Sequence, residues 1–170
     1  MKFDIWGNID MSASSLDLTD LRILEEVQKE GRISVVELSR RVSLTKTPCA
    51  ERLRRLERSG VISGYFARLD PVVMEAAHIV MVQVQLRGTT ADDLDAFNRA
   101  VARIPEIQSC HMIAGGYDYL LKVRTRNIEA YRKVLGDVIS RLPGVQQTQT
   151  YVVMETVKDE VTLPVPRSRP

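Results

Sequence analysis

The 170-residue sequence lacks most features of a secreted, membrane-bound or disulfide-stabilised protein. It has only two cysteines, Cys49 and Cys110, which cannot build a disulfide scaffold, so reduced thiols are the simpler interpretation. No apolar run reaches the roughly 20 residues that span a bilayer. The first 15 residues also lack the apolar core of a secretory signal. We therefore expect a cytoplasmic protein that makes no membrane contact.

Signatures of catalysis and metal binding are also missing. No GxSxG, Walker or GxGxxG motif occurs. Cys110 and His111 are neighbours in a predicted strand, so their side chains point to opposite faces, and His78 has no nearby residue of ligand type. The pair Asp92 and Asp93 opens a predicted helix, where the helix dipole accounts for it. We expect no enzymatic activity, no metal and no cofactor.

The first third of the chain has helical periodicity. Its apolar residues recur every three or four positions, which predicts three helices, the last ending at Gly60. Ser34 followed by Glu37 predicts a capping box at the second helix, and Thr45 is expected to cap the third. Two short helices and a tight turn before a third helix predict a winged-helix-like helix-turn-helix in residues 16–60.

The second half alternates between strand and helix patterns. Val80, Val82 and Val84 occupy alternate positions, which is typical of a strand. The expected elements are strands at 77–86, 107–114, 117–125 and 145–157, and helices at 90–103 and 127–141, with a tight turn at Gly115-Gly116. The order βαββαβ predicts a ferredoxin-like domain.

These patterns predict an α+β protein with two domains. The expected parts are a disordered extension at 1–15 (with Met11 as an alternative start), a helix-turn-helix domain at 16–60, a linker strand at 61–76, a ferredoxin-like domain at 77–158, and a flexible tail at 159–170. The two helices cover one face of the sheet. Met81, Tyr151 and Val153 would leave apolar surface on the other face, which favours a dimer.

Positive charge is concentrated around the third helix. Residues 40–58 contain seven Lys and Arg against two Glu, a net +5, whereas the whole chain carries only +2. Basic side chains bind phosphates, and short polar groups at a helix start read base edges. The predicted DNA-binding residues are Thr45, Lys46, Thr47, Arg52, Arg54, Arg55 and Arg58. The alternative is a solvated helix face supported by ion pairs such as Glu51–Arg55.

Long stretches of the chain are similar to one family. LDLTDLRILEEVQKEGRISVVELSRRVSLTKTPCAERLRRLERSGVISGY, EIQSCHMIAGGYDYLLKVR and AYRKVLGDVISRLPGVQQTQTYVVMETVK follow each other in order and at the right spacing. The chain resembles the Lrp/AsnC (feast/famine) family of prokaryotic transcription regulators, particularly its leucine-responsive branch. The resemblance implies that residues 77–158 are an ACT-like (RAM) ligand-binding and oligomerisation domain. It also implies dimers that assemble into octamers or larger rings, bend double-stranded DNA at the nucleoid and bind amino acids at subunit interfaces.

The resemblance also implies an effector site. Its residues are Met112, Gly115, Gly116, Tyr117, Asp118, Ile128, Val152 and Val153. Glycines allow backbone N–H groups to approach a carboxylate, and Asp118 can pair with an ammonium. The alternative is that the two glycines form only a hairpin turn and that Asp118 is a solvated turn residue. Family members often carry an acidic or polar residue where this chain has Gly116.

Three functions are compatible with the sequence. The first is a sequence-specific regulator of amino-acid metabolism genes, with leucine, another branched-chain amino acid or proline as effector. The second is a nucleoid-type architectural DNA-binding protein. The third is an ACT-like regulatory subunit without DNA binding, which would not need the basic third helix.

Overall fold

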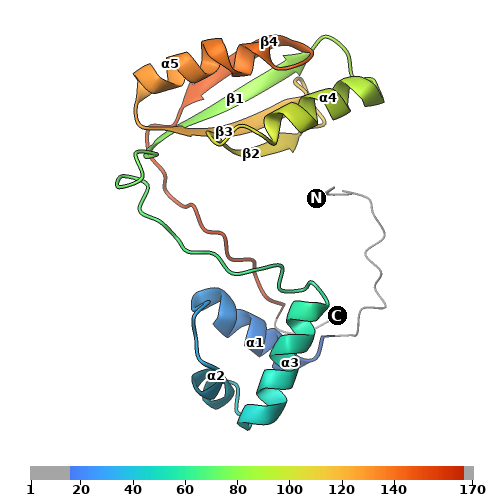
Figure 1. The fold of residues 1–170 in the computed structure, drawn as a ribbon, viewed down its shortest axis with the longest axis vertical. Coiled ribbons are helices and arrows are strands. Elements are labelled where there is room, and N and C mark those ends of the chain that lie inside the picture. Colours follow the sequence, from blue (N-terminus) through green and yellow to red (C-terminus); the bar gives the residue numbers. More distant parts are fainter. Residues whose placement is uncertain (1–15, 167–170) are drawn as a thin grey trace. The chain divides into compact units, whose positions relative to one another are not determined.

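The computed structural model describes residues 16–166 and divides them into two compact units (Figure 1). Among the described residues, the first unit holds residues 16–67 together with residues 160–166. The second unit is Arg68–Asp159. The predicted extension at 1–15 and the last four residues lie outside the described residues.

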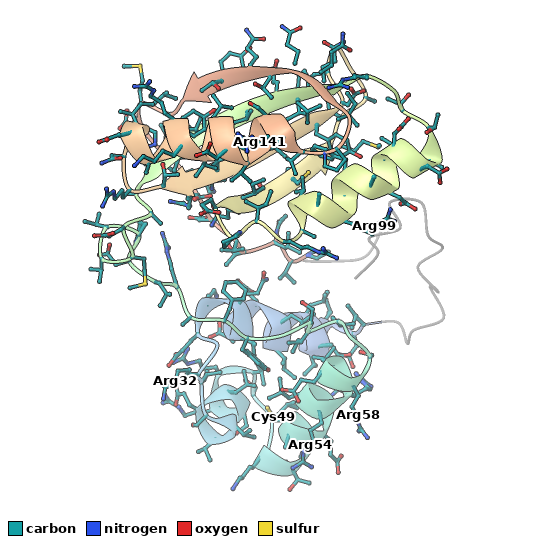
Figure 2. The ribbon with its side chains drawn as sticks, turned by 45° about the horizontal axis from the view of Figure 1, so that its top comes forward. Arg32, Cys49, Arg54, Arg58, Arg99 and Arg141 are labelled. Carbon is teal, nitrogen blue, oxygen red and sulfur yellow. The ribbon has the colours of Figure 1, made fainter. Side chains whose placement is uncertain are left out.

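The first unit is a three-helix domain formed by α1 (Leu18–Lys29), α2 (Val35–Arg41) and α3 (Lys46–Arg58). Each helix contributes apolar side chains to one core, in which Ile23, Leu38, Cys49 and Leu56 are at most 1% exposed. Cys49 lies inside this domain in Figure 2. The predicted order of helices is confirmed, and Gly60 follows α3 with a left-handed φ of 76°.

Two of the predicted caps differ from the structure. The Ser34 hydroxyl accepts a hydrogen bond from the Glu37 N–H, at 3.2 Å, but the Glu37 carboxylate binds Arg40 and Arg41 instead of completing the box. Guanidinium groups compete successfully for it because charge-assisted hydrogen bonds are stronger than neutral ones. Thr45 occupies the N-cap position of α3, but its side chain makes no capping hydrogen bond. Its hydroxyl is therefore available to another partner.

The segment at 61–76 was predicted as a linker strand. In the described residues it belongs to no strand, and Asp70, Pro71 and Ala76 delimit a turn instead. Ala76 N–H donates to the Pro71 carbonyl at 2.7 Å, and the Asp70 carboxylate accepts from the Val72 N–H at 2.7 Å. Extended backbone becomes a strand only when a neighbouring backbone pairs with it.

The second unit is a four-stranded antiparallel sheet with helices on one face (Figure 1). Its elements are β1 (His78–Leu86), α4 (Ala91–Val101), β2 (Ile107–Met112), β3 (Tyr119–Thr125), α5 (Ile128–Asp137), the 3₁₀ helix η1 (Ile139–Arg141) and β4 (Val145–Val152). The strand order is β2-β3-β1-β4. This is the predicted βαββαβ ferredoxin-like arrangement.

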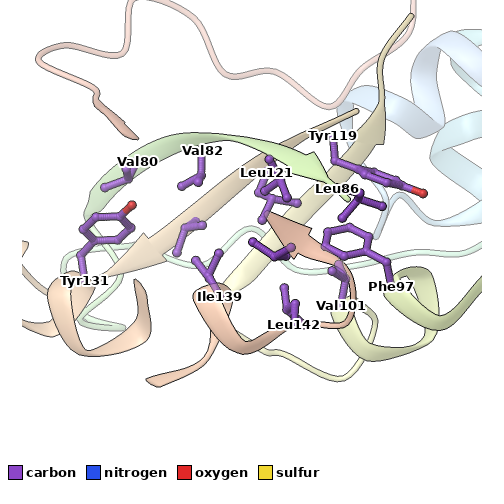
Figure 3. Close-up of a cluster of buried hydrophobic side chains, with 13 residues drawn as sticks. Val80, Val82, Leu86, Phe97, Val101, Tyr119, Leu121, Tyr131, Ile139 and Leu142 are labelled. Atoms are coloured by element: carbon purple, nitrogen blue, oxygen red, sulfur yellow. The ribbon is translucent and has the colours of Figure 1, made fainter. Parts of the chain in front are cut away.

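The core of this unit lies between the sheet and its helices (Figure 3). Val80, Val82 and Val84 are fully buried, and the rings of Phe97 and Tyr119 lie 4.4 Å apart. Alternate residues of the same strands face the other side of the sheet, which no helix covers. There Met81 of β1 is paired with Tyr151 of β4, which is 44% exposed.

Element ends differ from the sequence-based prediction for identifiable reasons. The predicted Gly115-Gly116 turn is a longer connection closed by the Ile113 N–H and the Asp118 carbonyl, at 2.8 Å. Neither glycine has the positive φ that a two-residue turn needs. The strand predicted at 145–157 is shorter in the structure: β4 ends at Val152, opposite Val80, and one further hydrogen bond joins the Val153 N–H to the Ile79 carbonyl at 3.0 Å.

The predicted flexible tail makes contacts in its described part. The Asp159 carboxylate accepts from Lys122 Nζ, at 2.7 and 2.8 Å, and from Arg124 Nη2 at 3.0 Å. The Gln28 side-chain amide donates to the Leu163 carbonyl at 3.1 Å and accepts from the Leu163 N–H at 2.7 Å. Residues 159 and 163 are therefore each held by specific partners.

Candidate DNA-binding surface and effector site

The start of α3 combines exposure with polar chemistry. Thr45, Lys46 and Thr47 are exposed, while Cys49 and Leu56 of the same helix are buried. Pro48 lies in the first turn, where a helix needs no N–H donor. The helix is thus fixed by its apolar stripe and presents its first turn to solvent, which is the geometry that base reading requires.

Arg52 and Arg55, both predicted as DNA contacts, hold α3 against α1. Arg52 Nη1 lies 2.6 Å from an Asp17 oxygen and 2.9 Å from Asp20 Oδ1, and Arg55 Nη2 lies 2.6 Å from Asp20 Oδ2. The Asp20 side chain is 1% exposed. Two guanidinium groups therefore neutralise a buried carboxylate at the α1–α3 contact. The predicted Glu51–Arg55 pair is absent from the salt bridges of residues 16–166.

Arg40 and Arg41 are also paired within the domain. Both bind Glu37, and Arg41 additionally reaches Glu26 at 3.2 Å and Glu30 at 3.0 Å. This network joins α2 to α1. Much of the +5 charge predicted for this stretch is consequently balanced inside the domain.

Lys46, Arg54 and Arg58 remain exposed and unpaired. Among residues 16–166, no carboxylate lies within salt-bridge distance of any of the three. Figure 2 shows Arg54 and Arg58 on the outer side of α3, whereas Arg32 lies on the opposite side of the helical domain. Arg58 Nε donates to the Arg54 carbonyl at 3.3 Å. These three cations and the first turn of α3 form the surface that we call the α3 face.

Sequence reasoning missed the role of Asp17 and Asp20. They form a reciprocal capping box at α1, in which Asp20 N–H donates to Asp17 Oδ1 at 2.8 Å and Asp17 N–H donates to Asp20 Oδ2 at 3.2 Å. Two acceptor residues three positions apart before an apolar run are the available signal for this cap. The long-range pairing with α3 had no such signal.

The charges on α2 predict acid sensitivity. Hydrogen bonds from Arg40 and then Arg41 lower the pKa of Glu37 from 4.5 to about 2. A depressed folded-state pKa adds stability above the unfolded pKa, and this stability is lost as the pH falls towards the folded value. We expect Glu37→Gln to be less stable than the wild type near neutral pH, and the difference in urea midpoint to shrink between pH 4.5 and about 2. A pH-independent difference would contradict this explanation.

The connection at 113–118 lies at the Leu86 end of the sheet. Asp118 Oδ2 accepts from the Leu86 N–H at 2.7 Å, and Asp118 N–H donates to the Val84 carbonyl at 3.0 Å. Asp118 is therefore held at the end of β1, where the β1–β4 register shifts. Its second carboxylate oxygen has no hydrogen-bond partner among the described residues.

The glycines of this connection face open space. A Cβ atom on Gly116 would meet nothing within 4 Å, and one on Gly115 would meet only the Ile113 side chain at 3.6 Å. Gly116 and Tyr117 line a small hollow of about 60 Å³ with the glutamines of β1 and β4. Nothing within one chain explains the glycine at 116 sterically.

The remaining predicted effector residues lie at the other end of the sheet. Val153 N–H donates to the carbonyl of Ile79, whereas Asp118 binds the N–H of Leu86. Seven strand positions separate Ile79 from Leu86, which is about 23 Å at 3.3 Å per residue. Ile128 follows Thr125, the partner of His78 in the β1–β3 register, so it also lies at the far end. One chain does not bring the two groups together.

Each group also exposes apolar surface. Met112 is 48% exposed beside the 113–118 connection, and Ile128 and Val152 are 50% and 49% exposed at the far end. Exposed aliphatic side chains at both ends of the sheet are typical of surfaces that contact another molecule. The two groups could meet only if a second chain supplied one of them.

Other chemistry is limited in the described part of the chain. Burial raises the pKa of the Cys110 thiol to about 11, so this thiol stays protonated at neutral pH. No group of three or more His, Cys, Asp or Glu suited to a metal ion occurs within residues 16–166. None of the helices in the same range is long and apolar enough to cross a membrane.

Comparison with known proteins matches both units. The sequence profile of the winged helix-turn-helix DNA-binding domain covers residues 16–63, and that of the Lrp/AsnC ligand binding domain covers residues 79–163. The leucine-responsive regulatory protein of Escherichia coli is 54% identical over 143 residues, which are 84% of this chain and 87% of the relative.

Solved structures agree with this assignment. A transcriptional regulator from Neisseria meningitidis in complex with L-Met superposes with a TM-score of 0.84 at 34% identity, over 88% of this chain and 97% of that one. An AsnC family transcriptional regulator from Agrobacterium tumefaciens gives a TM-score of 0.83 at 30% identity, over 87% and 96% of the two chains.

The fold and these matches define a transcriptional regulator with a DNA-binding helix-turn-helix domain and a separate ligand-binding domain. The chain belongs to the Lrp/AsnC family.

Proposed function

We propose that this regulator controls genes of amino-acid metabolism in the cytoplasm, at the nucleoid, through a composite amino-acid site formed by two copies of the chain. The observation that carries the proposal is the division of the effector residues between opposite ends of one sheet. A site shared between copies also couples effector binding to assembly, because a ligand stabilises the arrangement that it binds.

The α3 face is the proposed DNA contact. Thr45, Lys46 and Thr47 reach base edges, while Arg54 and Arg58 bind phosphates. Arg52 and Arg55 orient the helix through their ion pairs with α1. In a two-fold dimer, two copies of α3 would read half-sites about one helical turn, or a multiple of it, apart.

The uncovered face of the sheet is the proposed dimer interface. Met81 and Tyr151 provide apolar surface there, and Val153 lies at its edge. Four glutamines, Gln83, Gln85, Gln147 and Gln149, adjoin them. An amide both donates and accepts, so such a face is complementary to itself under two-fold symmetry. Larger rings, such as octamers, would then bring further copies into contact.

The composite site suits an amino acid. Asp118 offers its second oxygen to the ammonium, and the open backbone at Gly115 and Gly116 allows N–H groups to approach the carboxylate. Ile128 and Val152 of another copy would cover an aliphatic side chain. Leucine, another branched-chain amino acid and proline are the proposed effectors. Methionine should also be tested, because the similar regulator from N. meningitidis was solved in complex with L-Met.

Asp118→Asn separates the two roles of this residue. The amide oxygen can still accept the Leu86 N–H, so we expect a thermal midpoint close to wild type. Loss of the charge should weaken effector binding at least about tenfold, because a hydrogen bond to a charged group contributes 1.5–3 kcal/mol. Calorimetry and gel shifts with each amino acid measure this. Unchanged effector affinity would remove Asp118 from the site.

Mixing two defective variants tests the composite site itself. Asp118→Asn damages the 113–118 end, and Ile128→Ser damages the other end. In a mixed pair of subunits, one composite site carries both defects and the other carries none. The co-assembled mixture should therefore regain an effector-dependent gel shift that neither variant shows alone. If the site lay within one chain, every site would keep one defect and mixing would restore nothing.

A further inference from the structure

A second cavity in the sheet unit has a lining that suits a small ligand. Its volume is about 470 Å³, within the 300–1,000 Å³ typical of ligand sites. Its walls are the turn at 74–76, the start of β2, the end of β3 and the first two turns of α5. It therefore lies at the His78 end of the sheet, away from Asp118.

Charges of both signs surround this cavity without partners. Glu75, Glu106 and Arg126 line it, and none of them takes part in a salt bridge within residues 16–166. Arg124, which also lines the cavity, is paired with Asp159. A lining that holds two carboxylates and a guanidinium without salt-bridge partners matches a ligand that itself carries a cation and an anion.

Arg124 is fixed at the cavity wall. Its Nε donates to Gln108 Oε1 at 2.7 Å, its Nη1 to the Ala76 carbonyl at 3.1 Å, and its Nη2 to Asp159 Oδ2 at 3.0 Å. A guanidinium has five N–H donors, so two remain for a ligand. A side chain held at three points loses little entropy when a ligand binds to it.

The turn that forms another wall is also held in place. Glu75 has a left-handed φ of 51°, which a non-glycine residue rarely adopts. Hydrogen bonds from Ala76 N–H to the Pro71 carbonyl and from Met74 N–H to the Asp70 carbonyl close the turn around it. Strained backbone of this kind is concentrated at ligand-binding positions.

We propose that this cavity binds a free amino acid as a zwitterion, independently of the composite site. Arg126 and the remaining N–H groups of Arg124 receive the carboxylate, and Glu75 and Glu106 receive the ammonium. Ala130 and Val134 of α5 line the cavity and contact the side chain of the ligand. A small aliphatic side chain fits this wall best.

The test uses calorimetry on the full chain in the Asp118→Asn background, with L-leucine and L-methionine as probes. Glu106→Gln and Arg126→Gln are each expected to weaken the remaining binding at least about tenfold. Glu129→Gln and Arg132→Gln are matched controls on α5, because neither residue lines the cavity. Both controls should leave the affinity for the probes unchanged. Leucinamide and 4-methylvalerate, which lack one of the two charges, should not bind.

Two outcomes would overturn the proposal. One is the absence of binding of either probe at millimolar concentration in the Asp118→Asn background. The other is binding that the cavity variants and their controls affect equally. Ala130→Leu gives a check without any charge change, because it fills the cavity and should abolish binding. The composite site is judged separately, by recovery of the gel-shift response on mixing variants.

Discussion

Replacing Asp20 with alanine should lower the free energy of unfolding of the helical unit by about 1.5–3 kcal/mol, because it removes charge-assisted hydrogen bonds to two arginines that are themselves 30% and 46% exposed. The Asp20 carboxylate is 1% exposed, binds Arg52 and Arg55, and accepts the Asp17 N–H of the capping box. The substitution leaves Arg55 without its partner and opens the α1–α3 contact. DNA affinity should fall with stability, because α3 loses its fixed orientation.

Chemical denaturation followed by circular dichroism measures this loss. Asp92→Ala is the control, because Asp92 lies in the exposed first turn of α4 and interacts mainly with the helix dipole. Asp20→Asn should fall between the two, since it keeps an acceptor but loses the charge. If Asp20→Ala cost no more than Asp92→Ala, the ion pairs would not hold α3 in place.

Neutralising the three cations of the α3 face should weaken DNA binding on the order of a hundredfold at about 0.1 M salt. Each phosphate contact adds about 0.9 to the slope of log affinity against log salt. The triple variant Lys46→Gln, Arg54→Gln, Arg58→Gln loses the two phosphate contacts of Arg54 and Arg58, so its slope should fall by about 1.8 per bound chain. The fold should be unaffected, because none of the three has a salt bridge among residues 16–166.

A second triple variant controls for net charge. Arg32, Arg99 and Arg141 are exposed in the described chain. Arg32 lies on the opposite side of the helical domain from Arg54 and Arg58 (Figure 2), and Arg99 and Arg141 belong to the sheet unit. Changing all three to glutamine removes the same charge but should leave the salt slope nearly unchanged. Equal losses in both triple variants would mean that the protein binds DNA through its overall charge and not through α3.

The local patterns that the sequence predicted correctly are those set by neighbouring residues. The helical spacing of the first third and the alternation of Val80, Val82 and Val84 depend on which side of an element is buried, and both are confirmed. Errors arose in the choice of side-chain partners and at the ends of elements. The Glu37 carboxylate binds Arg40 and Arg41 instead of completing its cap, and the strand predicted to run to 157 ends at Val152.

The interpretation of the basic residues from the sequence alone was limited in a similar way. A count of basic residues singled out α3 but could not separate the arginines that pair with Asp17 and Asp20 from those without a salt bridge among residues 16–166. That division depends on Asp17 and Asp20, which lie 32 to 35 residues before their partners. Periodicity contains no information about such a pairing.

The effector site could not be assembled from one sequence for a related reason. The resemblance implied eight residues, and the strand register places them at two ends of one sheet. The composite pocket that we propose would close only between copies, and such a pocket has no signature in the packing of a single chain.

Site-specific cross-linking to DNA tests the central claim most directly, which is that the α3 face lies on the duplex in two symmetry-related copies. A photoreactive residue at Thr47, in the first turn of α3, should cross-link at two positions related by a dyad and separated by about 10 base pairs or a multiple of that. The same group at Arg32 should not cross-link to DNA. Cross-links from position 32 and none from position 47 would contradict the account.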